Sequence, residues 1–125
     1  MWLKKFKGGK ERADTVLNGL EFISSQANAN DWVWVHDAAR PVIPKGTIPA
    51  LLAALDNAPG AIPAQPVADT LKRVVDGLIQ ETVPREGLFR AQTPQAFRFA
   101  ALKAAHEARV GAVTDDASLL EAQGQ

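Results

Sequence analysis

The spacing of hydrophobic residues changes along the chain, and each spacing predicts a different element. Between residues 12 and 24, apolar residues recur every three or four positions, which predicts a helix with one buried face. Residues 32–35, Trp-Val-Trp-Val, form an apolar run without polar alternation. Such a run is typical of a strand buried on both faces, as in a parallel sheet, so we expect parallel neighbours for it.

Two more helices follow from the same pattern. Residues 44–55 carry their large apolar side chains on one side. We expect this helix to begin near Thr47, because Pro49 then lies in its first turn, where proline is tolerated. Residues 98–109 predict a second helix, in which several alanines would allow a close approach to neighbouring elements.

Residues 70–83 are more polar than the rest of the chain. Two β-rich segments flank Asp76-Gly77, a dipeptide strongly preferred in two-residue hairpin turns. A hairpin this polar has little to bury against its own domain, and an isolated hairpin needs packing from elsewhere to be stable. Two interpretations stay open at this point: an ordinary edge hairpin, or a protruding arm over residues 67–85.

Strands that alternate with helices predict a layered α/β fold. Only two or three strands can be counted for the sheet, whereas such sheets commonly have five or more. We therefore expect one domain over residues 1–125 with an incomplete sheet.

Composition limits the classes of function. The 125 residues are 46% hydrophobic and 22% charged, and 14 basic residues balance 14 acidic ones. Because the net charge is zero, there is no bulk attraction to nucleic acid or to an acidic membrane, and any anion site must be local. The absence of cysteine excludes disulfides and thiolate metal sites and fits a cytoplasmic location. No apolar run approaches the roughly 20 residues needed to span a bilayer.

The segment His-Asp-Ala-Ala-Arg-Pro directly follows the expected strand at residues 32–35. Ligands of open α/β sheets bind beyond the carboxyl ends of the strands. Asp37 is placed there to hold a hard cation such as magnesium against phosphate oxygens, Ala38 leaves room for a ligand, and Arg40 offers a bidentate fork for phosphate. The alternative is a loop ion pair between Asp37 and Arg40, with His36 bonded to the backbone.

Other polar segments are less specific. Gly8, Gly9 and Lys10 precede a helix start, where free N–H groups favour an anion, but taken alone they are better explained by a flexible loop with a solvated lysine. Thr93-Pro94 is a turn signal. The segment Val-Thr-Asp-Asp-Ala-Ser is most simply a helix start, capped by its Thr or its first Asp.

Taken together and in order, five segments are far more specific. They are GGKERADTVLNGL, VHDAARP, PVADTLKR, VPREGLFRAQTPQAF and VTDDASLLE. These segments resemble the successive motifs of the 2-C-methyl-D-erythritol 4-phosphate cytidylyltransferase family, and the resemblance extends from Gly8 to about Gly124. HDAARP and RAQTPQAF are its most diagnostic segments.

The resemblance implies a Rossmann-like nucleotidyltransferase fold with a β-hairpin dimerisation arm. It also implies an enzyme that joins 2-C-methyl-D-erythritol 4-phosphate to CTP in non-mevalonate isoprenoid biosynthesis, with magnesium or another divalent cation. The products are 4-diphosphocytidyl-2-C-methyl-D-erythritol and pyrophosphate. The protein mainly has to position two anions and neutralise the charge that develops between them.

The family's motifs also imply roles for individual residues. Three matching positions are implied to be catalytic: Asp37 as the magnesium-associated carboxylate, Arg40 at the polyol phosphate, and Arg85. The implied substrate contacts are Gly9, Lys10 and Thr15 around the cytosine and ribose, Ala38 in the nucleotide site, and Thr93 and Thr114 around the polyol phosphate, while Thr70 and Arg85 are implied to reach the neighbouring subunit's site. The family often has Asp where Lys10 stands and Ser where Thr15 stands.

The family's Gly-rich, Arg-bearing loop and its C-terminal Lys have no counterpart in the printed sequence. We therefore expect a fragment or an incomplete record, with weak or no turnover on its own, since each missing cation can supply several kcal/mol. Two alternatives remain: a non-catalytic dimerising fragment, and a cytidylyltransferase for another polyol phosphate such as ribitol 5-phosphate. A generic phosphate-binding domain explains the clusters but not their order.

Overall fold

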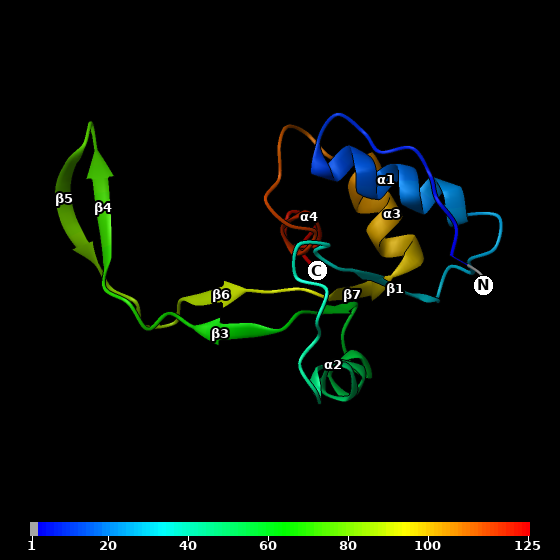
Figure 1. Cartoon of the computed structure of the whole chain (residues 1–125), viewed down its shortest axis with the longest axis horizontal. Helices are drawn as coiled ribbons and strands as arrows, with labels where there is room; N and C mark the ends of the chain where they lie inside the picture. The colour runs from blue at the N-terminus through cyan, green and yellow to red at the C-terminus, as the bar shows by residue number, and fades with distance from the viewer. Residues whose placement is uncertain (1–2) are drawn as a thin grey trace.

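The computed structural model describes residues 3–125, so residues 1 and 2 of the predicted 1–125 domain lie outside it. Figure 1 shows a helix-covered body and a long arm that extends from it. The elements in chain order are α1 (Arg12–Ile23), β1 (Trp32–Val35), α2 (Thr47–Leu55), β2 (Gly60–Ala61), β3 (Ala64–Pro66), β4 (Leu71–Val75), β5 (Leu78–Val83), β6 (Phe89–Ala91), β7 (Gln95–Arg98), α3 (Phe99–Glu107) and α4 (Ala117–Glu121). The fold is therefore α/β, as predicted.

The body is built on a three-stranded sheet in the order β1–β7–β2. Both pairings are antiparallel, so the prediction of parallel neighbours for residues 32–35 is wrong. An apolar run reports how a strand is covered and says nothing about the direction of its neighbours. The coverage is also less complete than expected, since all four residues of β1 are only half-buried.

Helices cover both faces of this sheet. In Figure 1, α1 and α3 lie above it and α2 lies below. The core between the sheet and the upper helices is made of residues Leu20, Phe97, Phe99, Leu102, Ala105, Leu119 and Leu120. Gly60 allows the close contact of β2 with β7, because a Cβ there would lie 2.3 Å from Cδ1 of Phe97.

The predicted helix boundaries are largely confirmed, with one correction. The second helix begins at Thr47, as predicted from the position of Pro49. The N-cap of the last helix is Asp116, whereas the sequence favoured Thr114 or Asp115. Asp115 still contributes to this helix start, because its Oδ1 accepts a hydrogen bond from the Ser118 N–H at 3.1 Å.

The arm has two sections. Near the body, β3 pairs with β6, and at the far end β4 pairs with β5, both antiparallel. The outer hairpin turns at Asp76 and Gly77, whose φ values of 48° and 78° match the left-handed conformation that such turns require. The structure thus favours the protruding arm over the edge hairpin, and the β3–β6 section extends the projection beyond the predicted range of 67–85.

None of the helices among residues 3–125 is both long enough and apolar enough to cross a membrane.

Candidate functional site

A cavity of about 580 Å³ lies beyond the carboxyl end of β1, between the first turn of α1 and the chain that leads into α4. Its walls come from segments that are far apart in the sequence. The predicted site residues that line it are Thr15, Asp37, Ala38, Arg40, Thr93 and Thr114. The fold therefore brings the Asp37–Arg40 cluster together with Thr15, Thr93 and Thr114.

Asp37 lines this cavity and is held there by hydrogen bonds of its backbone and its side chain. Its N–H donates to Oγ1 of Thr93 at 3.1 Å, and its Oδ1 accepts the N–H of Ala39 at 3.0 Å. Its Oδ2 lies 3.8 Å from Nε of Arg40, which is too long for a strong hydrogen bond. Because the Arg40 side chain is 72% exposed, the pair is loose, and both groups remain available to a ligand.

Thr93 ties the segment before β7 to the end of β1. Besides accepting the Asp37 N–H, its hydroxyl lies 3.0 Å from Nδ1 of His36. His36 is thus bound by a side chain, whereas the alternative of a loop ion pair had it bonded to the backbone. Its Nε2 is buried and has no hydrogen-bond partner among residues 3–125.

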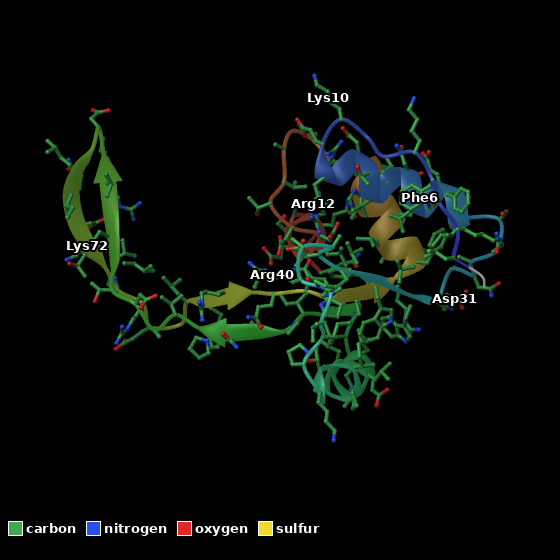
Figure 2. All side chains as sticks on the ribbon, viewed as in Figure 1. Phe6, Lys10, Arg12, Asp31, Arg40 and Lys72 are labelled. Carbon is green, nitrogen blue, oxygen red and sulfur yellow. The ribbon has the colours of Figure 1, made fainter. Side chains whose placement is uncertain are left out.

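The Gly-Gly loop packs onto the start of α1. The Gly9 N–H donates to Oγ1 of Thr15 at 2.9 Å, and a Cβ on Gly9 would lie 2.2 Å from Cβ of Asp14. The loop therefore requires glycine for its close approach to the helix. Neither Gly9 nor Lys10 lines the cavity, and Figure 2 shows Lys10 pointing away from the body.

The structure does not bring Thr70 and Arg85 to this cavity. Both lie at the base of the outer hairpin, and Figure 1 shows that hairpin standing well away from the body. The Arg85 guanidinium donates to the carbonyl oxygen of Ala68, which keeps it within the arm. Within a single chain in this conformation, the two residues do not contact the cavity.

Sequence reasoning missed Gln95, which fixes the part of the cavity lining formed by Thr114 and Asp115. Gln95 is 1% exposed; its Nε2 donates to Oδ2 of Asp115 at 3.1 Å, and its Oε1 accepts the N–H of Ala117 at 3.2 Å. These bonds fix the chain that carries Thr114. The only sequence signal was the adjacent Asp115 and Asp116 before an apolar run, which a helix cap already explained.

A second missed group lies beneath the cavity. Asp116 is fully buried; its Oδ2 accepts from Arg12 at 2.6 Å, and its Oδ1 lies 2.9 Å from Nε2 of His106. Burial acts to raise the pKa of Asp116, but the hydrogen bonds from His106 and Arg12 outweigh it and hold that pKa below its ordinary value. The carboxylate is therefore ionised at neutral pH.

The model of the 2-C-methyl-D-erythritol 4-phosphate cytidylyltransferase family matches residues 3–125 of the chain. The chain belongs to this family. A cytidylyltransferase of that name from Acidithiobacillus ferrooxidans is 57% identical over 122 residues. A bifunctional IspD/IspF enzyme from Granulibacter bethesdensis is 56% identical over 117 residues.

Solved structures agree with the family assignment. A 4-diphosphocytidyl-2C-methyl-D-erythritol synthase, 44% identical, superposes with a TM-score of 0.85 over 94% of this chain and 56% of its own. The family's enzyme from Thermus thermophilus, 36% identical, gives 0.80 over 94% of this chain and 57% of its own. These likenesses confirm the predicted nucleotidyltransferase fold.

The chain spans only a portion of these relatives. The matched region is 94% of this chain in both sequence relatives, but 52% of the Acidithiobacillus enzyme and 31% of the bifunctional one. The activity, substrates and partners of a whole family member are therefore matters for proposal.

The residues present suit a magnesium ion of the kind that the family implies. No cluster of three or more His, Cys, Asp or Glu side chains within residues 3–125 forms an all-protein metal site. Magnesium is usually held by one or two carboxylates together with substrate phosphates and water, and Asp37 supplies one half-exposed carboxylate facing the cavity. Asp115 also faces the cavity, but its two oxygens are occupied by Gln95 and Ser118.

Proposed function

We propose that this chain supplies the polyol-phosphate and cytidine side of a cytidylyltransferase site that joins 2-C-methyl-D-erythritol 4-phosphate to CTP. The observation that carries the proposal is the cavity that gathers Asp37, Arg40, Thr93 and Thr114 beside Thr15. A site for two phosphate-bearing substrates requires cations, hydroxyl donors and one metal-binding carboxylate at one place, and this cavity has all three.

The reaction forms one bond and breaks one bond at phosphorus. A phosphate oxygen of the polyol substrate attacks the α-phosphorus of CTP in line, and the bond from that phosphorus to the bridging oxygen of the β-phosphate breaks. Pyrophosphate leaves with the electron pair, so no proton transfer is required of a side chain. The work of the protein is to position the two anions and to stabilise the charge between them.

The chain's own groups fit these tasks. The loosely held guanidinium of Arg40 is free to make a bidentate contact with the polyol phosphate, flanked by the hydroxyls of Thr93 and Thr114. Asp37 would hold magnesium, which when bound neutralises phosphate charge. Ala38 is small and leaves room for the nucleotide, and the backbone of the Gly9–Lys10 loop, which Thr15 holds, would contact the cytidine outside the cavity.

The arm supports a proposal of shared sites in a homodimer. In the hairpin, Val74, Leu78 and Ile79 are between 55% and 69% exposed. An isolated hairpin is only marginally stable in water, so a surface that covers these apolar side chains would stabilise it. A second copy of the chain would cover them and would carry Thr70 and Arg85 to its partner's cavity. We also propose a cytoplasmic location, which the absence of cysteine suggests.

The test is a titration of the chain with CTP and magnesium, with and without 2-C-methyl-D-erythritol 4-phosphate, followed by phosphorus NMR. We expect the two substrates to bind at the cavity and to give the diphosphocytidyl product slowly. Asp37→Asn should bind CTP without dependence on magnesium. The proposal is wrong if the phosphorus resonances of neither substrate change when the chain is added.

Ribitol 5-phosphate in the same assay tests the alternative substrate, which would have to give product faster than the methylerythritol compound. A folded dimer that binds neither polyol phosphate nor CTP would favour the alternative of a non-catalytic dimerising fragment.

A further inference from the structure

Arg12 lies in the first turn of α1 and lines the same cavity as Asp37 and Arg40. Figure 2 shows Arg12 and Arg40 on the side of the body from which the arm leaves. The sequence motifs gave Arg12 no role, because it falls between the Gly-Gly loop and Thr15. Its side chain is 43% exposed, so the guanidinium is neither buried nor freely solvated.

The Arg12 guanidinium is held by a buried carboxylate, Asp116, which is itself hydrogen-bonded to His106. Both oxygens of the fully buried Asp116 are used, one by Arg12 at 2.6 Å and the other by Nε2 of His106 at 2.9 Å. Because an ionised carboxylate only accepts hydrogen bonds, Nε2 of His106 must carry the hydrogen. The His106 side chain is itself 0% exposed, so the three groups form a line from the core to the cavity wall.

Most of the donor capacity of Arg12 is left over. A guanidinium has five N–H donors, and within residues 3–125 Arg12 donates only to Asp116. A second arginine in the body makes the contrast clear: Arg109 pairs with Asp14, is 16% exposed and does not line the cavity. Arg109 therefore serves the packing of α1 on α3, whereas Arg12 presents fixed, unused donors to the cavity.

We propose that Arg12 binds a phosphate group in this cavity and that Asp116 and His106 are positioning residues for its guanidinium. Arg12 and Arg40 then contact the bound anions from two walls, α1 and the loop after β1. The identity of the phosphate, on CTP or on the polyol, rests on the proposed function. The anion contact itself does not, because it depends only on the cavity and the supported guanidinium.

The test measures affinity of the whole chain for inorganic pyrophosphate by titration calorimetry. Arg12→Met should weaken binding about ten- to hundredfold, as expected for the loss of hydrogen bonds to a charged group. The pyrophosphate affinity of Arg12→Lys should lie between those of the wild type and Arg12→Met, because lysine keeps the charge but loses the bidentate guanidinium geometry. The matched control Arg109→Met should bind pyrophosphate like the wild type, even if it unfolds more easily.

Salt dependence separates positioning from a general structural effect. Arg12→Met should lower the steepness with which affinity falls as salt rises, because one cation has left the site. Asp116→Asn should weaken binding severalfold with an unchanged steepness, since the guanidinium remains but is no longer held. If Arg12→Met does not fold, the double variant Arg12→Met/Asp116→Asn, which removes both charges together, gives the same comparison.

Parallel titrations with CTP and with 2-C-methyl-D-erythritol 4-phosphate assign the phosphate, since only the ligand held by Arg12 should lose affinity in Arg12→Met. The inference is overturned if wild type does not bind pyrophosphate, if Arg12→Met binds it equally well, or if Arg109→Met loses as much. If Arg12→Met loses affinity for pyrophosphate while the wild type binds neither CTP nor 2-C-methyl-D-erythritol 4-phosphate, the inference is supported and the proposed function is overturned.

Discussion

The body and the arm are held together by different physics. In the body, buried residues such as Leu20, Leu102 and Leu120 pack from three helices, and polar side chains are tied across long sequence separations. In the arm, the two strands of the outer hairpin pair only with each other, and apart from the half-buried Leu71 and Val83 the side chains that pair across them are exposed. The body thus positions its functional residues by itself, whereas the arm positions them only with respect to one another.

This contrast separates the predicted site residues into two groups. Those of the body, such as Asp37 and Thr93, are fixed by hydrogen bonds of their own chain at 3.1 Å or less. Those of the arm, Thr70 and Arg85, flank the outer hairpin, do not line the cavity, and have a defined place relative to it only if a second surface receives the arm. Eight of the ten predicted site residues are thus positioned by the body of one chain, whereas the two in the arm have no fixed position relative to the cavity within that chain.

The largest difference that we predict between body and arm is in the free energy of unfolding lost when a leucine is replaced by alanine in each region. Leu102→Ala removes a side chain that is 0% exposed and should lower the free energy of unfolding by about 2–5 kcal/mol. Leu78→Ala, at a residue 69% exposed, should change it by less than about 0.5 kcal/mol in a dilute, monomeric sample. Urea unfolding followed by circular dichroism measures both.

The pair of variants also tests the arm. If Leu78→Ala costs nearly as much as Leu102→Ala at low protein concentration, the arm packs within its own chain and the contrast fails. A cost for Leu78→Ala that grows with protein concentration would sharpen the contrast, because it would show that a second copy covers the arm.

The next largest effect concerns the buried carboxylate of the body. Asp116→Asn should lower the free energy of unfolding at pH 7 by about 1.5–3 kcal/mol, because hydrogen bonds to a charged group are lost. The folded-state pKa of Asp116 is depressed below 3.8, so its contribution is present above that value and is lost as pH falls through the lower folded pKa. Urea midpoints between pH 2 and pH 6 should therefore fall less steeply for the variant.

Asp14→Asn is the comparison for this acid range. The pKa of Asp14 is lowered, chiefly by the hydrogen bond from Arg109. Like Asp116, Asp14 therefore stabilises the fold above its unfolded pKa, and this contribution is lost as pH falls through the lower folded pKa. Equal acid profiles for wild type and both variants would mean that neither carboxylate contributes through its charge.

How far the sequence predicts this molecule depends on whether the deciding contact is local. The helices at 12–23 and 47–55 and the turn at Asp76-Gly77 follow from periodicity, proline placement and turn chemistry, all read within a few residues. Strand β7 was not foreseen, because a segment that begins with Gln95 after Thr93-Pro94 carries a turn signal and only a short apolar stretch. Its central place in the sheet depends on neighbours more than 30 residues away.

The same rule applies to the candidate site. Asp37, Arg40 and the two threonines were assigned to one site because motif order indicated a family, and all four line the same cavity. Four residues escaped notice because a helix start, a turn signal, a cap or a helix interior already explained them: Arg12, Gln95, Asp116 and His106. Their pairing joins residues as much as 104 positions apart, which no local pattern reports.

A smaller effect is expected where the body's loop meets its first helix. Gly9→Ala would place a Cβ 2.2 Å from Cβ of Asp14 and 2.8 Å from the backbone nitrogen of Thr15, so the loop must move. Because the loop is exposed, we expect little change in stability but about a tenfold loss of CTP affinity from the misplaced backbone donors. Gly77→Ala, at a turn of the arm, is the control and should leave CTP affinity unchanged in a monomeric sample.

The smallest effect tests the cross-strand pairing of the arm. Arg73 donates to Glu81 at 2.6 Å, but the two side chains are 60% and 57% exposed, so water and salt compete for both charges. Glu81→Gln should lower the free energy of unfolding by no more than about 1 kcal/mol, and 1 M salt should erase the difference because it screens exposed pairs. In the body, the Arg12–Asp116 pair ends in a fully buried carboxylate, so the effect of Asp116→Asn should survive the same salt. If salt abolishes both effects alike, the electrostatics of body and arm do not differ in kind.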